Sequence, residues 1–417
     1  MTATTFFRDG LIAGENVGEP LQSGFPAVDP GYNADVSLGT LAIYLKLASD
    51  APPELHEAFR AAAEMHLKFF FPDGSLDGSW GSRSFKWSVF GSKTAHGSQM
   101  WTWLLGEHDG RFTRAALQNA RLMQSMLSGH LLGTGGHHRR SGAPACIHST
   151  WNRADCLANS LHYGPAETQP EEPLPLETPG FRTFLPSVNI FLARTEKLAV
   201  SVSAYGYSSG SAMLKPAQPM GGAVSYLWHD GWGPVQVGSQ AVYRRYELHN
   251  MPEAPGDSPA PSTPCIILTR GEKQFSNVFD TAARLEESAD GVKARGTLRS
   301  IERTSADAAF SIDYRLEASA VKKTYRVSGL RASETPEVIE PIVIPENPTY
   351  ETLPDGRGVV IKSETARIAL TVENGSAALP DVSPAYMPFP GFYTVQPRIK
   401  MNSGDGKAAV KVRLEVD

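Results

Sequence analysis

The residues best suited to chemistry gather in one stretch, from Pro72 to Trp103. Four tryptophans lie there, and the basic side chains among its glycines and serines are Arg83, Lys86, Lys93 and His96. Aromatic residues on Gly-rich loops beside cations are typical of a groove for a polar, ring-shaped ligand. Sugars fit, because pyranose faces stack on tryptophan while Arg and Lys bind carboxylates or sulfates. The expected sugar platforms are Trp80, Trp87 and Trp101. The alternative is that these tryptophans are core residues.

Two side chains of this stretch could act directly on a substrate. His96, in TAHGSQMW, stands where loop is expected to become helix, and its imidazole could give or take a proton near neutral pH. Arg83, in WGSRSFKW, could pair with a substrate carboxylate, as could Lys86. The alternative for Arg83 is a loop anchor that donates hydrogen bonds to backbone carbonyls.

Further candidates lie downstream, and all eleven histidines precede Asn250. His148, in PACIHSTWNRAD, stands ahead of an expected helix with Arg153 about one turn later; a buried capping histidine is the alternative. His229 lies between two tryptophans in GGAVSYLWHDGWGP. The strand end VYRRYELHNM would present either Tyr246 or His249 to a substrate, because alternation places them on opposite faces. Ordinary cross-strand pairing is the alternative there.

These candidates must be positioned by helices first and strands later. Apolar residues at i, i+3, i+4 and i+7 predict helices at about 38–48, 53–69, 97–106, 112–127 and 150–161. Short loops between them indicate antiparallel hairpins. After residue 180 the period changes to alternation, and short strands recur at regular spacing. The expected domains are helical over 1–164, a Pro-rich linker over 165–180 and a large antiparallel β-sandwich over 181–417.

Composition narrows the class of protein. The 417 residues are 41% hydrophobic and 20% charged, which is sufficient for a core, and the formal net charge of −5 without a basic block argues against nucleic acid. Cys146, Cys156 and Cys265 have no zinc or disulfide spacing, so no cofactor is expected, although a structural divalent metal such as zinc is left open. No apolar run suits a membrane span. The beginning lacks a signal peptide, which predicts a cytoplasmic protein, or a periplasmic or secreted one if the N-terminus is truncated.

The layout resembles the heparinase II/III-like polysaccharide lyases, including the related alginate lyases. His96-Gly97 looks like the Asn-His-Gly of those enzymes, and WGSRSFKW, CIHSTWNRAD and GGAVSYLWH are similar to segments of the same group. The resemblance implies an α/α toroid followed by an antiparallel β domain. It also implies β-elimination next to a uronic acid, in which the C5 proton is removed after the carboxylate charge is neutralised. Five or six helices fit before residue 165, so we expect either a partial toroid or a chain that lacks the N-terminal part of a longer protein.

Carried onto this chain, the resemblance matches His96 to the family's first histidine and His229 or His249 to the histidine from the strand domain, with Arg83 able to neutralise the carboxylate. His148 could take the place of the family's helical tyrosine, so we expect His96 and His148 to transfer protons. The catalytic group from the strand half would be Tyr246 or His249, and the residues expected to bind the glycan are Trp80, Lys86, Trp87, Trp101, Arg153 and His229. Two positions depart from the family. Ala95 stands where the family has asparagine, and the helical tyrosine has no clear match near His148 and Trp151.

Three hypotheses follow. The first is a lyase acting on a uronic-acid-containing polysaccharide or oligosaccharide, a carbon–oxygen lyase whose partner is that acidic glycan, with a homo-oligomer left open. The second is a glycoside hydrolase that uses Asp73, Asp77 or Glu107 in the same groove. The third is a non-catalytic glycan-binding protein, which Ala95 favours.

Overall fold

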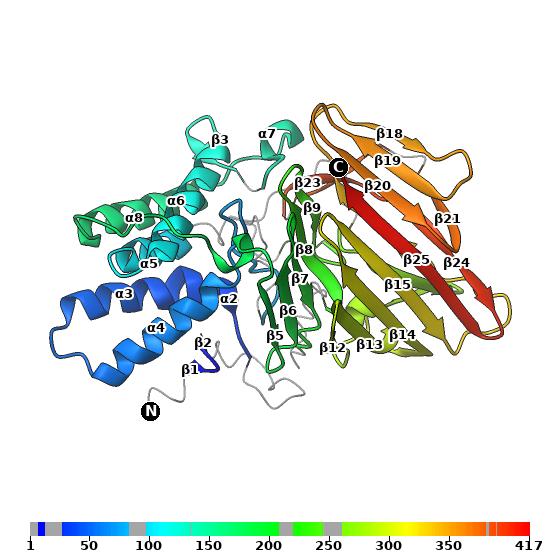
Figure 1. Cartoon of the computed structure of the whole chain (residues 1–417), viewed down its shortest axis with the longest axis horizontal. Coiled ribbons are helices and arrows are strands. Elements are labelled where there is room, and N and C mark those ends of the chain that lie inside the picture. The colour runs from blue at the N-terminus through cyan, green and yellow to red at the C-terminus, as the bar shows by residue number, and fades with distance from the viewer. Residues whose placement is uncertain are drawn as a thin grey trace.

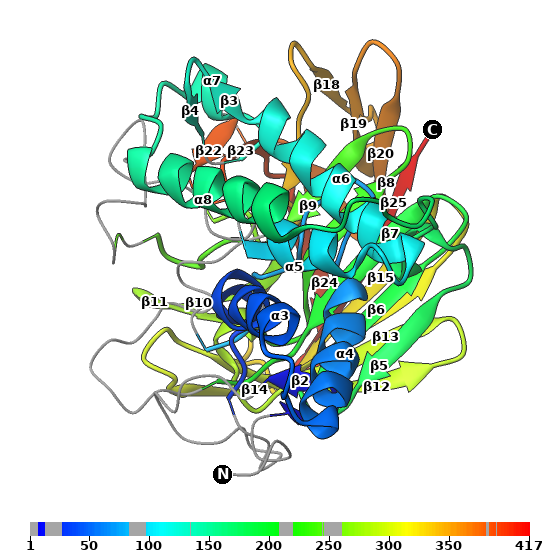
Figure 2. The same ribbon diagram turned by 90° about the vertical axis from the view of Figure 1, so that its left-hand side faces the viewer.

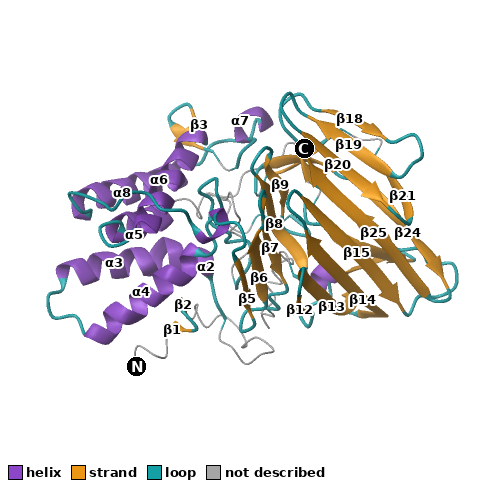
Figure 3. Ribbon diagram, viewed as in Figure 1, coloured by secondary structure: helices purple, strands orange, loops and turns teal. Residues whose placement is uncertain are grey.

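A computed structural model of the 417-residue chain shows a helical region followed by a β-rich region (Figure 1). The structure describes residues 7–12, 27–82, 97–133, 135–207, 220–243, 245, 261–380, 383–388 and 390–417. This order of helices and then strands is the one that the change of periodicity predicts. A five-stranded sheet stands between the helices and the larger sheet (Figure 3).

The helical region matches the predicted helices closely. Its helices are α2 (Pro30–Tyr32), the π-helix η1 (Asn33–Ser37), α3 (Leu38–Leu47), α4 (Pro53–Leu67), α5 (Gly97–Leu105), α6 (Gly110–Ser125), α7 (His138–Ser141) and α8 (Ile147–Tyr163). Pro53 is the first residue of α4, where its missing N–H costs nothing. The Asp109 carboxylate caps α6 by accepting from the Arg111 amide at 2.8 Å. Figure 2 shows α3, α4, α5, α6 and α8 lying over the sheets.

Residues 165–180 lie along the helices rather than apart from them. Leu174 and Leu176 are fully buried, and the latter lies in a 3₁₀ turn, η2 (Pro175–Glu177). The Glu177 carboxylate accepts from Arg114 and Gln118 of α6, at 2.8 and 2.7 Å. This acidic segment therefore packs against the helical region.

The five-stranded sheet has one face in each of two cores. Its strands, in spatial order, are β5 (Arg182–Leu185), β6 (Ile190–Arg194), β7 (Leu198–Ser203), β8 (Ala223–His229) and β9 (Gly233–Val237). Along β6, Ile190 and Leu192 join the core shared with the helices, whereas Phe191 and Ala193 join the core shared with the larger sheet. This alternation buries both faces of the sheet.

The remaining strands form a larger antiparallel sheet and a small one. They are β10 (Cys265–Arg270), β11 (Lys273–Ser276), β12 (Arg284–Ser288), β13 (Gly291–Arg299), β14 (Ser305–Leu316), β15 (Ala320–Ser328), β16 (Glu337–Ile339), β17 (Ile342–Val343), β18 (Thr349–Thr352), β19 (Gly358–Lys362), β20 (Arg367–Val372), β21 (Gly375–Ala378), β22 (Ala385–Met387), β23 (Phe392–Val395), β24 (Arg398–Gly404) and β25 (Lys407–Val416). Two-residue strands pair as β1 (Phe7–Arg8) with β2 (Leu11–Ile12) and β3 (Leu127–Ser128) with β4 (Leu131–Leu132); η3 (Asn277–Phe279) is a 3₁₀ turn.

Strand pairing corrects the expected sandwich. β25 pairs with both β15 and β24, so the order β25-β15-β14-β13-β11-β10-β16-β24 returns to its start and closes a ring of eight strands. Closure follows from β25 being long enough, at ten residues, to pair with β24 and β20 along the same edge. The β-rich region is thus a barrel-like ring, which removes free edges from those eight strands.

A buried polar network joins β9 of the five-stranded sheet to the ring. The Lys323 ammonium donates to Glu340 Oε2 at 2.7 Å and to Gln236 Oε1 at 2.8 Å. Gln236 Nε2 donates to the same carboxylate at 2.7 Å, and the Tyr325 hydroxyl donates to its other oxygen at 2.5 Å. Burial lowers the pKa of Lys323, and the adjacent Glu340 carboxylate opposes that shift.

Candidate functional site

The start of the Pro72–Trp103 stretch is a tight turn held against α6. At Gly74 the backbone has a φ of +83°, and a Cβ there would lie 2.4 Å from the Gln118 carbonyl. Only glycine suits both constraints. Asp73 Oδ1 accepts from the Ser75 amide at 3.0 Å and from its hydroxyl at 2.5 Å, which closes the turn predicted at Pro72-Asp73-Gly74.

The same stretch docks onto β8. The Tyr226 hydroxyl donates to Asp73 Oδ2 at 2.5 Å, and the Ser225 hydroxyl donates to Asp77 Oδ2 at 2.8 Å. The Phe71 and Tyr226 rings lie 4.2 Å apart. Burial raises the pKa of Asp73, and burial together with that carboxylate raises the pKa of Tyr226. Tyr226 therefore remains a hydrogen-bond donor that holds the two regions together.

Trp80 and Trp101 do not offer a face to a sugar, and here the core alternative is correct. Their exposed fractions are 1% and 0%. Trp80 packs between Phe69 and Tyr205, with ring centroids 5.0 and 5.5 Å away. Trp101 packs edge-on to Phe112 at 6.0 Å, among other aromatic rings of the helical core. The positions of the two tryptophans in the helix and the turn direct their rings inward. The many glycines and serines of the stretch make this inward direction hard to recognise in the sequence.

Arg153 and His229 are also buried, so their expected contact with a glycan needs correction. Arg153 lies on the inner face of α8 with an exposed fraction of 0%, and burial lowers its pKa to about 10. His229 turns toward the ring of strands rather than toward the helices. Its Nε2 lies 3.1 Å from the Ser319 hydroxyl, and its Nδ1 accepts from the Gly231 amide at 3.0 Å. Both residues stabilise the fold in this conformation.

His148 is exposed in the first turn of α8, so it is not the buried capping residue of the alternative. Its Nε2 lies 3.1 Å from Asn152 Nδ2. Asn152 in turn lines a hollow of about 480 Å³ between α3, α5 and α8, together with Asp35, Thr40, Tyr44, Met100 and Asn159. The helix α5 on one side of the hollow begins at Gly97, the residue that follows His96 in the sequence. This hollow, with His148 beside it, is the candidate site.

The hollow suits a hydroxylated ligand. Tyr44 is 47% exposed and can stack on a sugar ring, while the amides of Asn152 and Asn159 can bind hydroxyl groups. Asp35 and Asp155 also line it, so a cation must accompany any acidic sugar that binds there. Six predicted site residues lie outside the described residues: Arg83, Lys86, Trp87, His96, Tyr246 and His249. All except Trp87 could supply a cation, an acid or a base.

The carboxylates of the hydrolase hypothesis do not form a catalytic pair. Asp77 is fully buried and accepts from Ser79 and Ser225. Asp73 is held by Ser75 and Tyr226. Glu107 lies 3.8 Å from the Lys46 ammonium at the far end of α5. A pair of carboxylates flanking a glycosidic bond needs access to substrate, which Asp77 lacks.

A contact that sequence reasoning missed joins the loop at 135–141 to the β-rich region. His137 Nδ1 accepts from the Tyr393 amide at 2.8 Å, and its own amide donates to the Gly391 carbonyl at 3.0 Å. The Arg140 guanidinium lies 4.8 Å over the Tyr393 ring and donates to the Ile344 carbonyl at 3.2 Å. The sequence of the HHRR motif (residues 137–140) is typical of a solvated basic loop. Its docking role is visible only in the structure, where the motif lies beside β23.

Two observations on the described residues concern metal binding and membrane insertion. No group of three or more His, Cys, Asp or Glu residues in that part of the chain is placed to hold a metal ion. Among the described helices, none has the length and apolar character needed to cross a membrane.

Comparisons with known proteins place both regions. The family described as "Ulvan lyase N-terminal domain" matches residues 1–178, and "Ulvan lyase C-terminal domain" matches 181–416. A broad-specificity ulvan lyase of Formosa agariphila is 30% identical over 265 residues, 63% of this chain and 41% of its own length. The chain thus spans about two fifths of that relative.

Two solved structures share the fold. "Heparinase III-BT4657 gene product" covers 96% of this chain and 53% of its own, with a TM-score of 0.52 at 10% identity. A second heparinase III covers 99% and 55%, with a TM-score of 0.52 at 12% identity. This likeness agrees with the resemblance to heparinase-like lyases that the motifs indicate. With its two domains matched in order over nearly the whole sequence, the chain belongs to the ulvan lyase family.

Proposed function

We propose that this chain is a polysaccharide lyase that cleaves a uronic-acid-containing glycan by β-elimination. The observation that carries the proposal is the match of both ulvan lyase domains, in order, to its helical and β-rich regions. Ulvan, the polysaccharide named for the Formosa relative, is the first substrate to test. On this proposal the helices α3 to α8 are part of an α/α toroid.

In the proposed reaction a base takes the C5 proton of the uronate, the C4–O4 bond breaks and a C4=C5 double bond forms. The leaving O4 takes up a proton, so the reaction needs no organic cofactor. Arg83 is proposed to neutralise the carboxylate, which stabilises the charge that develops after proton removal. His96 and His148 are proposed to transfer protons, with Tyr246 or His249 as the group from the strand half.

The structure supports this proposal in two respects. His148 is accessible to solvent beside a polar hollow, and that hollow is lined by residues from three helices, α3, α5 and α8. Lys86 and Trp87 are proposed to bind the glycan in place of the buried tryptophans. The buried, fully hydrogen-bonded Asp77 weighs against the hydrolase.

The test is absorbance at about 235 nm, where a new C4=C5 bond conjugated to a carboxylate absorbs, after incubation with ulvan and other uronate glycans. Replacing His148 with alanine should lower kcat by roughly 10²-fold or more, the usual contribution of a general acid or base. His162→Ala, an exposed histidine at the other end of α8, is the matched control. No absorbance with any uronate glycan would refute the proposal. Binding without turnover would identify the non-catalytic alternative that Ala95 favours.

A further inference from the structure

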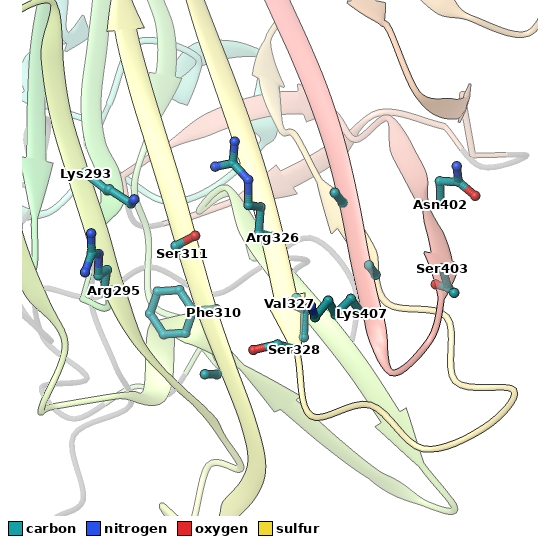
Figure 4. Close-up of a pocket in the computed structure, with 14 residues that line it drawn as sticks. Lys293, Arg295, Phe310, Ser311, Arg326, Val327, Ser328, Asn402, Ser403 and Lys407 are labelled. Carbon is teal, nitrogen blue, oxygen red and sulfur yellow. The ribbon is translucent and has the colours of Figure 1, made fainter.

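A second hollow lies on the outer face of the ring of strands. Figure 1 shows that these strands lie on the opposite side of the five-stranded sheet from the helices. The hollow measures about 630 Å³ and extends over β13, β14, β15, β24 and β25 (Figure 4). None of its lining residues, all in the described part of the chain, is acidic. Four are cationic: Lys293, Arg295, Arg326 and Lys407.

Strand register places these cations in adjacent rows across the sheet. Arg295 lies opposite Ser311, and Ser311 lies opposite Arg326 on the next strand. Because neighbouring strands are about 4.8 Å apart, the backbones at Arg295 and Arg326 are roughly 10 Å apart on one face. Ser328, two residues along β15, lies opposite Lys407. The cations therefore form a stripe across the strands.

Most cations elsewhere on this face have carboxylate partners. Arg413 is paired with Glu317 and Glu415, and Lys411 lies 2.9 Å from Glu373. In the hollow, Arg295 has a looser contact of 3.3 Å with Glu286, and both side chains are more than half exposed.

Three of the hollow's cations stand apart from that pattern. Lys293, Arg326 and Lys407 have no ion-pair partner among the described residues. Asp313, the cross-strand neighbour of Lys293, forms no ion pair with it there. Figure 4 shows Lys293 and Arg326 leaning toward each other over β14. Like charges on one face of neighbouring strands repel one another, and a bound anion would relieve that repulsion.

We propose that this hollow is a second, non-catalytic binding surface for an acidic polysaccharide, and this inference rests on the proposed function. Its cations bind carboxylates or sulfates, and the polar side chains of Ser311, Asn402 and Ser403 bind sugar hydroxyls. The open shape of the hollow admits a segment from within a long chain. Nucleic acid is the less suitable polyanion, since the whole chain has a net charge of −5. The surface holds polymeric substrate while cleavage takes place elsewhere on the molecule.

The experiment uses the full chain and measures its retardation in native gels that contain increasing amounts of ulvan. The test variant combines Lys293→Thr, Arg326→Thr and Lys407→Thr, since threonine suits exposed strands. The control combines Lys273→Thr, Arg331→Thr and Lys362→Thr, three exposed cations outside the hollow, and changes the net charge equally. We expect the test variant to need about tenfold more ulvan for the same retardation at low salt. The ratio of its cleavage rate on polymer to that on short oligosaccharides should fall as well.

Unchanged retardation of the test variant, or an equal loss in the control, would overturn the proposal. So would wild-type chain that is retarded by duplex DNA and not by ulvan. The absorbance assay on wild-type protein keeps the two proposals distinguishable. Cleavage with unaltered retardation of the test variant refutes this surface alone, whereas absence of cleavage refutes the proposed function.

Discussion

Replacing Glu340 with glutamine should destabilise the β-rich region strongly. In the native structure the Glu340 carboxylate faces the Lys323 ammonium at 2.7 Å, and the side chains of both residues are fully buried. The substitution keeps the size of the side chain and removes its charge. Lys323 must then either hold an uncompensated charge inside the protein or lose its proton, and both outcomes cost free energy.

The size of the destabilisation follows from the polar groups that remain around Lys323 after the substitution. Gln236 Oε1, at 2.8 Å, still accepts one hydrogen bond, but it carries no charge. Removing one partner of a buried ion pair typically costs about 3 to 5 kcal/mol. For a region of this size each kcal/mol lowers the melting temperature by about 2 to 4 °C, so a decrease of roughly 6 to 20 °C is expected.

Urea unfolding followed by circular dichroism measures this loss. Glu351→Gln is the matched control, because Glu351 pairs with Lys362 at 3.3 Å with both side chains half exposed or more, and such pairs contribute at most about 1 kcal/mol. The double variant Lys323→Met with Glu340→Met should recover much of the loss, since apolar residues of similar volume leave no buried charge. If Glu340→Gln costs no more than Glu351→Gln, the pair does not hold the sheets together as argued.

Three other predictions concern the helical region. Trp101→Ala should cost about 3 to 5 kcal/mol in urea unfolding because its ring fills the core, whereas Trp151→Ala, at 69% exposure, should change stability little. His137 has its pKa lowered to about 3 by burial, so its contribution is complete above the ordinary value of 6.5 and is lost as pH falls from there toward 3. His137→Asn should flatten the stability–pH curve in that window, and an unchanged curve would contradict this. Asp73 has a raised pKa, so its contribution is present at acidic pH and is lost as pH rises through that pKa; Asp73→Asn should gain stability relative to wild type over that rise, as thermal melts across pH would show.

Local sequence patterns predicted the helices, because the formation of each helix depends on residues within its own segment. The apolar spacing of α3, α4, α5, α6 and α8 and the proline that starts α4 are both properties of nearby sequence. Closure of the ring was not predictable in this way. It depends on β25 pairing with β15 at one edge and with β24 and β20 at the other, and such pairings join residues far apart in the chain. Alternation alone is the same in a sandwich and in a barrel.

The candidate site shows the same difference between features set by nearby sequence and features set by residues far apart in the chain. Residue type suggested sugar contacts for Trp80 and Trp101, but the direction of each ring depends on partners such as Tyr205, which lies more than a hundred residues away. The position of His148 near the start of a helix could be predicted from nearby residues, and the structure places it in the first turn of α8; its catalytic role stays a prediction. The distribution of histidines gives no sign of the cations in the outer hollow, because the strands after Asn250 carry no histidine. Their alternation, with Lys293 and Arg295 two residues apart, was the available signal.

Docking of the helical region at two separate places has a consequence for catalysis. Hydrogen bonds to Asp73 and Asp77 fix one segment on β8, and the contacts of His137 fix the loop at 135–141 on β23. These two separated contacts add to the hydrophobic core that the helices share with the five-stranded sheet, and together they restrain rotation of the helices against the sheet. Proton transfer between groups on two regions requires their separation to be held within a fraction of an ångström or so. On the proposed function, the buried polar groups at this interface would hold the two regions in the relative position that proton transfer requires.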